Sequence, residues 1–260
     1  IRLFINNIEV ITMNNLTIRQ TFKYLFIYIL LIKFGILAYF VLITTMGLEL
    51  SYVQIAISNI LFSIIPTVYL LKKFKIDWKK DLKIRKIPIE QYIYLIIIAF
   101  LFQPICWGLG VLVAELSNVE PIRAYKFSFD SFIYFMIFSN IITPIIEEIW
   151  FRGLLFQKMK HIGNIAILIN GVIFAIAHLI LVQSSYTLLL GILCCYVFYT
   201  SKSLMAPIFL HFVHNSLQNL PENNYTETYY QFIRNPIYII PFMVLLILLM
   251  CYFSKKDNKI

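Results

Sequence analysis

Long apolar runs alternate with short polar segments along almost the whole chain. The long runs approach the length of ~20 residues that a helix needs to cross the hydrocarbon core of a bilayer. The runs lie near residues 22–46, 51–71, 89–114, 132–158, 163–182, 186–200, 203–220 and 236–253. This pattern predicts an all-α, polytopic integral membrane protein with about eight transmembrane helices.

A few residues interrupt the apolar runs. Pro66 could kink the second helix. The third run contains Pro104 and the small residues Gly108 and Gly110, and this small pair could let another helix pack closely. Lys33 lies inside the first run. It could reach back to the membrane interface or face a polar interior, and the sequence leaves both alternatives open.

The charges lie mostly between the apolar runs. The most basic segment, between the second and third runs, holds Lys72, Lys73, Lys75, Lys79, Lys80, Lys83, Arg85 and Lys86. Excess Lys and Arg mark cytoplasmic loops, so this segment is predicted to be cytoplasmic, with Trp78 as an interface anchor. Two spans separate it from the N-terminus, and the last run ends in further lysines. Both termini are therefore predicted to be cytoplasmic.

The composition agrees with a membrane protein. Hydrophobic residues make up 60% of the 260 residues and charged ones only 13%, against about 25% charged in ordinary soluble domains. The net charge of +9 does not indicate nucleic-acid binding, because basic loops beside a membrane attract anionic lipid heads. The expected surroundings are the lipid bilayer, and Ile-, Lys- and Asn-rich usage suggests a bacterial plasma membrane.

A single membrane domain is expected. Residues 1–21 form an N-terminal segment, and 1–12 could be an upstream extension because Met13 resembles a bacterial start. The transmembrane domain covers 22–253, and 254–260 form a cytoplasmic tail. The first apolar run is too long for the core of a cleavable signal peptide.

The four cysteines all lie in apolar runs. They are Cys106, Cys194, Cys195 and Cys251. No zinc-type spacing links them, so they are expected to be small buried hydrophobes.

The segment from Thr143 to Gly153 places three charged side chains inside an apolar run. A charge at bilayer depth costs at least ~2.5–3.5 kcal/mol, so such residues usually face the protein interior and serve a function. Glu148 and Arg152 have the i,i+4 spacing and order of a favourable helical ion pair. Glu147 points about 100° away and has no local cation. We therefore expect Glu148–Arg152 to brace the structure and Glu147 to be the working carboxylate.

Two later runs add imidazole and amide groups. The fifth holds His178, with Asn170 two turns earlier. The seventh holds His211 and Asn215 on one helical face, at i,i+4 spacing. His214 beside them could be an alternative ligand or a satisfied interior histidine.

A depth estimate tests whether these helices can share a site. Glu147 lies about 20 Å from the inner end of its helix, and His178 about 22 Å from its own. His211 lies only about 12 Å in, so its helix must begin deeper or the fourth helix must protrude into the cytoplasm. One site in the inner half of the membrane is then possible.

Such a cluster suits hydrolysis by water. Glu147 near His178 could hold and deprotonate a water, and His211 with Asn215 could donate hydrogen bonds to the oxyanion. The HExxH motif of zinc proteases is absent. Glu147, His178 and His211 could still supply three zinc ligands, an alternative that is not favoured.

The order and spacing of these residues resemble the CAAX-protease and bacteriocin-processing family of membrane proteases, also called type II CAAX prenyl endopeptidases. The matching residues are Glu147, Glu148, Arg152, Phe174, His178, His211 and Asn215, with Ser203-Leu204 and Pro207-Ile208 before the last pair. Any one motif is weak alone, but three in order on successive membrane helices are specific. The resemblance covers about 130–220, the expected protease-like core.

The resemblance implies an all-helical membrane fold with its site open to the cytoplasm. It implies that Glu147 and His178 activate water and that His211 and Asn215 stabilise the transition state. Structural or substrate-positioning roles fall to Glu148, Arg152 and Phe174. It also implies a glutamate-based site without a metal, so no cofactor is expected.

The leading hypothesis is an intramembrane endopeptidase that acts on a peptide or a membrane-anchored protein. In a bacterium, a bacteriocin, pheromone or leader peptide is a more plausible substrate than a prenylated protein. One alternative is a non-enzymatic immunity or scaffolding protein of the same fold, such as a bacteriocin self-immunity factor. Another is a proton-coupled transporter that uses the Glu and His cluster as a relay.

Overall fold

The computed structural model describes residues 16–48, 51–119, 133, 136–218 and 227–257. All regular elements in these ranges are helical. In chain order they are α2 (Ile18–Leu30), η1 (Leu31–Gly35), α3 (Ile36–Thr45), α4 (Tyr52–Asn59), η2 (Ile60–Ile64), α5 (Ile65–Lys73), α6 (Ile89–Leu116), η3 (Met136–Ile142), α8 (Thr143–Glu148), η4 (Ile149–Phe156), α9 (Gln157–Met159), η5 (Lys160–Ile162), α10 (Asn164–Ile176), α11 (Leu181–Ser201), α12 (Met205–Gln218), α13 (Glu227–Arg234) and α14 (Pro236–Asp257). Outside the described residues lie the predicted upstream extension, the start of the fourth span at Phe132, most of the loop before it, residues 219–226 and the last three residues of the tail.

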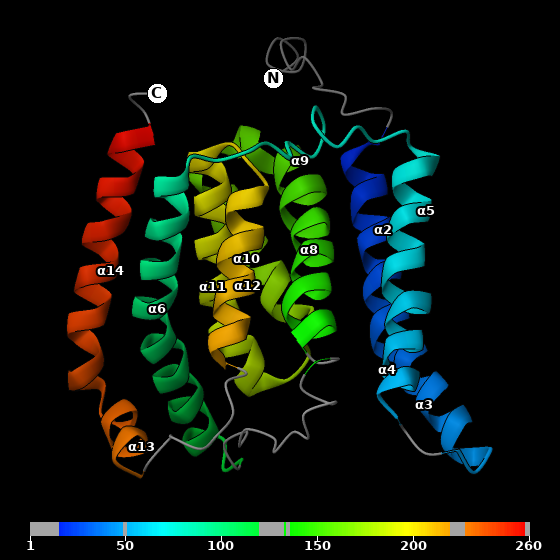
Figure 1. The fold of residues 1–260 in the computed structure, drawn as a ribbon, viewed down its shortest axis with the longest axis horizontal. Coiled ribbons are helices and arrows are strands. Elements are labelled where there is room, and N and C mark those ends of the chain that lie inside the picture. Colours follow the sequence, from blue (N-terminus) through cyan, green and yellow to red (C-terminus); the bar gives the residue numbers. More distant parts are fainter. Residues whose placement is uncertain (1–15, 49–50, 120–132, 134–135, 219–226, 258–260) are drawn as a thin grey trace, which may run out of the picture.

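The helices stand side by side in one bundle (Figure 1). The hairpin of α2–α3 and α4–α5 forms one edge, and α14 forms the opposite edge beside α6. α8, α10, α11 and α12 lie between these edges. The start of α2, the segment between α5 and α6, α9 and the end of α14 all lie at the same end of the bundle.

The length and surface of the helices fit a bilayer. Four described helices are long and apolar enough to cross a membrane: Ile18–Thr45, Val53–Lys73, Ile89–Leu116 and Leu181–Ser201. Asn164–Ile176 and Ile237–Tyr252 are shorter apolar helices. Large hydrophobic side chains such as Phe26 and Leu248 are more than half exposed, as expected where a surface meets lipid tails. The described part of the chain is thus all-helical, and the protein is a multi-pass membrane protein.

The first span begins at Ile18, before the predicted boundary near residue 22, because Thr17 caps it. The backbone N–H of Gln20 donates to Thr17 Oγ1 at 3.2 Å, and the N–H of Thr17 donates to Gln20 Oε1 at 2.8 Å. This reciprocal capping box satisfies two backbone donors that the helix leaves unpaired.

The fifth and sixth spans meet at a different place from the predicted turn at 183–185. α10 ends at Ile176 and α11 begins at Leu181, so Gln183 is helical. The chain reverses at Leu179, whose φ of 63° lies in the left-handed region that ends helices. Because no Gly or Pro marks this turn, the apolar pattern placed His178 inside a helix, whereas it lies just beyond one.

In the described ranges, four π-helical turns, η1 to η4, interrupt the membrane helices. Such turns re-aim side chains and are frequent at functional sites. η2 ends at Ile64, two residues before Pro66, whose ring would clash with the carbonyl of Phe62 in a regular α-helix. The predicted disturbance at Pro66 therefore takes the form of a π turn. η1 and η4 carry Lys33 and Arg152, both of which reach the site described below.

The basic segment between α5 and α6 covers the start of α12. The backbone N–H of Leu204 donates to Lys83 O at 3.0 Å, and Ser203 Oγ donates to Arg85 O at 2.5 Å. Leu204 and Ser203 are buried. α12 therefore begins beneath this segment, which agrees with the deeper start that the depth estimate requires for His211.

Three of the four cysteines are buried, as predicted, but Cys251 is exposed. It lies on α14 at the edge of the bundle, where an apolar side chain can face lipid instead of protein (Figure 1).

Glycines set the closest helix contacts. A Cβ on Gly108 of α6 would lie 2.0 Å from Ile239 Cδ1 of α14, so the close packing predicted at this position is confirmed. A Cβ on Gly191 of α11 would lie 2.9 Å from the Cα of Gly171 in α10. Here the obstacle is backbone, which cannot turn aside as a side-chain tip can.

Gly191→Ala is expected to destabilise the protein by about 1–3 kcal/mol, because the added methyl overpacks the α10–α11 contact. The matched control is Gly110→Ala, whose Cβ would meet Tyr186 at an ordinary 3.5 Å. Thermal unfolding of both variants in one detergent measures the difference. Equal midpoints for the two variants would contradict the prediction.

Candidate active site

The two adjacent glutamates end α8 and point into different surroundings. Glu148 is fully buried, and Arg152 Nη1 donates to its Oε1 at 2.8 Å. Arg152 Nη2 donates to Gly191 O, also at 2.8 Å, which fixes the guanidinium against α11. The predicted ion pair is therefore confirmed. The Glu147 side chain is 18% exposed and remains accessible.

His211 of α12 stands between the two carboxylates. Its Nδ1 lies 2.9 Å from Glu148 Oε1. Because Oε1 also accepts from Arg152, we assign the proton of this contact to Nδ1. Nε2 then lies 3.8 Å from Glu147 Oε2. The two groups are too far apart for a direct hydrogen bond, so a proton can pass between them only through a water or after a small movement of the side chains.

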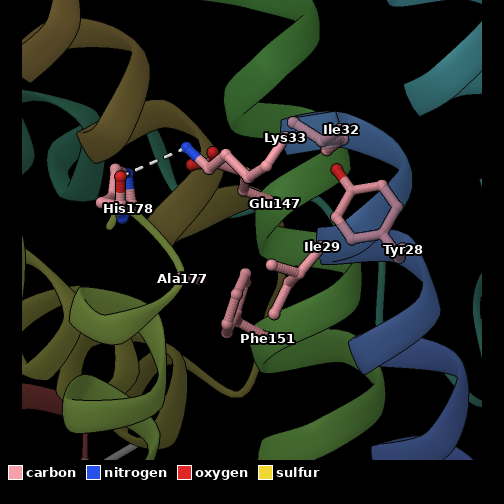
Figure 2. Close-up of a pocket in the computed structure, with 8 residues that line it drawn as sticks. All are labelled: Tyr28, Ile29, Ile32, Lys33, Glu147, Phe151, Ala177 and His178. Carbon is pink, nitrogen blue, oxygen red and sulfur yellow. Dashed lines mark hydrogen bonds between the residues drawn. The ribbon is translucent and has the colours of Figure 1, made fainter. Parts of the chain in front are cut away.

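A small pocket opens beside Glu147 (Figure 2). Its volume is about 40 Å³, larger than the ~10–15 Å³ that one water needs. The side chains that line it come from the first span, from α8 and η4, and from the end of α10: Tyr28, Ile29, Ile32, Lys33, Glu147, Phe151, Ala177 and His178. The pocket can therefore hold a water next to an acid and an imidazole.

His178 has a defined ring orientation. Its Nδ1 donates to the Phe174 carbonyl oxygen at 2.8 Å. In the neutral ring Nε2 then carries the lone pair and can accept a hydrogen bond. Glu147 and His178 thus line one pocket, as the sequence predicted.

Phe174 packs at the centre of the cluster and is fully buried. The Arg152 guanidinium carbon lies 4.5 Å from its ring centroid, a cation–π distance. The His178 ring meets its edge at 4.8 Å between centroids. These contacts show Phe174 as a packing residue that separates the ion pair from His178.

Asn215 does not line the pocket and lies beside the fourth span. Its Nδ2 donates to Ser139 O at 3.1 Å, and the neighbouring Ser216 contacts Asn140 at 3.4 Å. Asn215 thus ties α12 to η3. The second N–H of its amide is left for another acceptor.

His214 does not match the prediction of a satisfied interior histidine. It is buried against Phe102, with 5.5 Å between ring centroids. Within the described part of the chain, neither ring nitrogen has a hydrogen-bond partner. The ring points toward α6 because it lies off the face that His211 and Asn215 share.

The described residues bring together one group of potential metal ligands, Glu148, Cys194 and His211, within 4.8 Å of one another. This differs from the set considered from the sequence, which was Glu147, His178 and His211. Glu148 Oε1 is already bound by Arg152 and His211. A dication placed there would meet a guanidinium on the same carboxylate, so the donor set fits a metal ion poorly.

The sequence did not assign Lys33 and Tyr28 to the site. Tyr28 stacks on Trp150 at 4.5 Å, which holds α2 against η4. Lys33 reaches the pocket from η1, and its Nζ lies 3.4 Å from His178 O. The signal for Lys33 was its charge deep in an apolar run. Tyr28 gave no signal, because aromatic residues are frequent throughout the chain.

Comparison with known proteins shows which family this part of the chain is similar to. Residues 129–217 match the family described as "Type II CAAX prenyl endopeptidase Rce1-like". A stretch of 98 residues is 34% identical to the "Putative membrane peptidase YdiL" of Bacillus subtilis (strain 168), and covers 35% of this chain and 40% of that relative. No solved structure matches the chain. The resemblance expected from the motifs is confirmed, whereas nothing in these comparisons points to a bacteriocin.

Proposed function

We propose that this chain, whose residues 129–217 belong to the Rce1-like type II CAAX prenyl endopeptidase family, is a membrane endopeptidase. It would hydrolyse peptide bonds in a peptide or a membrane-anchored protein. The observation that carries the proposal is the water-sized pocket lined by both Glu147 and His178. An acid and an imidazole around one water are what general-base hydrolysis requires.

In the proposed reaction, Glu147 takes a proton from the water while the water oxygen attacks the carbonyl carbon of the peptide. His178 Nε2 orients the same water by accepting its other hydrogen. The carbonyl π electrons move to the oxygen, which becomes an oxyanion. When the carbon–nitrogen bond breaks, the proton passes from Glu147 to the leaving nitrogen, so that the products are an acid and an amine.

His211 and Asn215 are proposed to support the transition state from the α12 side. His211 Nε2 is proposed to share the proton that Glu147 receives through a water or after a small side-chain movement, because the two groups lie 3.8 Å apart and do not form a hydrogen bond. The second N–H of Asn215 is proposed as an oxyanion donor after small adjustments of the substrate-bound site. Glu148 and Arg152 hold His211 in place through the 2.9 Å contact with Glu148.

We also propose eight membrane crossings with both termini in the cytoplasm. The orientation can be tested at the basic segment between α5 and α6. The end of the bundle that carries this segment also carries the start of α2 and the end of α14 (Figure 1). A cysteine placed at exposed Lys79 is expected to react with a membrane-impermeant maleimide only from the inner side. Reaction from the outside would contradict this orientation.

The activity is tested with purified protein in lipid nanodiscs and a defined peptide library, with mass spectrometry of the products. New peptide termini are expected from the wild-type protein, with and without a chelator, because the proposed chemistry uses protein groups alone. Loss of these new peptide termini in a Glu147→Gln variant would support the assignment of Glu147 as the general base. Equal product patterns from wild-type protein and this variant would reject the proposed function.

A further inference from the structure

Lys33 brings a positive charge into the pocket from outside the segment that the family match covers. It lies in η1, the π-helical turn between α2 and α3 of the first span. Figure 2 shows its side chain directed toward Glu147 and His178, and all three residues line the pocket. A cation inside a membrane span is costly, and its usual justification is a function.

The ammonium group keeps unused hydrogen-bonding capacity. It carries three N–H donors. One points to the His178 carbonyl oxygen at a long 3.4 Å. Within the described residues, no carboxylate oxygen lies within 4.0 Å of it, so Glu147 lines the same pocket without closing an ion pair with Lys33. The remaining donors are available to a bound molecule.

The other candidate donors come from α12, lie outside the pocket lining and are each partly engaged. His211 Nδ1 is held by Glu148, and Asn215 donates to Ser139 O. Neither residue lines the pocket. Lys33 is the cation that lines the described pocket. It is therefore the group that would meet a negative charge developing beside the water of Glu147.

We propose that Lys33 is a catalytic residue that stabilises the oxyanion of the tetrahedral intermediate, an inference that rests on the proposed endopeptidase function. As water adds to the peptide carbonyl, the electrons of the C=O bond move to the oxygen, and the Lys33 ammonium donates a hydrogen bond to it. When the C–N bond breaks, the electrons return to form the product carbonyl. Lys33 keeps its proton throughout, while Glu147 carries the proton of the water to the leaving nitrogen.

The test compares Lys33→Met, Lys33→Arg and Phe34→Leu in nanodiscs. Phe34 is the matched control, because it lies on the same π turn and is exposed on its outer face. The probe is a quenched fluorescent peptide built on the library bond that the wild-type protein cleaves fastest. A second probe is the peptide aldehyde of the same sequence, whose hydrate mimics the tetrahedral intermediate.

Lys33→Met is expected to lower kcat about 10²–10³-fold with KM changed less than about threefold, as for loss of one oxyanion donor. Lys33→Arg should restore at least a tenth of the wild-type kcat, and Phe34→Leu should behave as wild type. The aldehyde should lose more affinity for Lys33→Met than the substrate does.

Unchanged kcat in Lys33→Met, or a change in KM alone, would overturn the role of Lys33 while the proposed function stands. Equal loss of affinity for the aldehyde and the substrate would also overturn it, since a merely structural defect affects both. If Glu147→Gln cleaves the peptide as fast as wild-type protein, the proposed function itself fails, and the role of Lys33 fails with it.

Discussion

Replacing Glu147 with glutamine is expected to lower kcat for peptide cleavage by about 10²–10⁴-fold, the usual contribution of a general base. Glutamine can still hold the pocket water, but it cannot accept the proton that the water must lose. Glu147 is 18% exposed and makes no close ion pair with Lys33 or Arg152, so the neutral variant should fold. Steady-state kinetics on the fluorescent peptide measure the effect.

Glu90→Gln is the matched control for this substitution. Glu90 is exposed in the first turn of α6, in the region of the basic segment and away from the pocket. Its variant should cleave at the wild-type rate and unfold at the same temperature. A Glu147 variant that keeps more than half of the wild-type kcat would show that another group takes the proton.

The second large effect is expected from Arg152→Met, which should destabilise the protein by about 3–5 kcal/mol, as when one partner of a buried ion pair is removed. The substitution leaves the Glu148 carboxylate buried without its guanidinium partner. It also removes the hydrogen bond to Gly191 O and the contact with the Phe174 ring. Unfolding in a titration from mild to denaturing detergent measures the loss.

The chain contains a surface ion pair of the same length that serves as a control. Arg234 Nε lies 2.8 Å from Glu115 Oε1, the same distance as in the buried pair, but its side chain is 52% exposed. Arg234→Met should therefore cost no more than about 1 kcal/mol. The double variant Glu148→Gln/Arg152→Met should be more stable than Arg152→Met alone. Similar losses for Arg152→Met and Arg234→Met would contradict the role assigned to burial.

Membrane segmentation and the central ion pair could be predicted from the sequence, because each depends on local spacing. An apolar run of about 20 residues predicts a membrane-spanning helix, because each helical residue adds ~1.5 Å along the axis. Glu148 and Arg152 meet because i,i+4 residues lie on one face, even though η4 is not a regular α-helix. Glu147 and His178 could be assigned to one pocket because polar residues are rare in the apolar runs and usually face the protein interior.

Features that depend on contacts between distant segments could not be predicted. The deeper start of α12 results from hydrogen bonds to Lys83 and Arg85, far away in sequence. The turn that carries His178 depends on the left-handed backbone of Leu179, a residue that gives no turn signal. The arrival of Lys33 in the pocket depends on a π turn and on the packing of Tyr28 against Trp150.

The most direct test of the central claim is to follow the oxygen atom of the attacking water. The wild-type protein in nanodiscs is incubated with the peptide in water enriched in heavy oxygen, and the new carboxyl termini are weighed by mass spectrometry. We predict that every newly formed carboxyl group gains one heavy oxygen from a single turnover and that Glu147→Gln forms labelled product at least about 10²-fold more slowly than the wild-type protein. Labelled product at the wild-type rate from Glu147→Gln, or no labelled product from wild-type protein, would contradict the account.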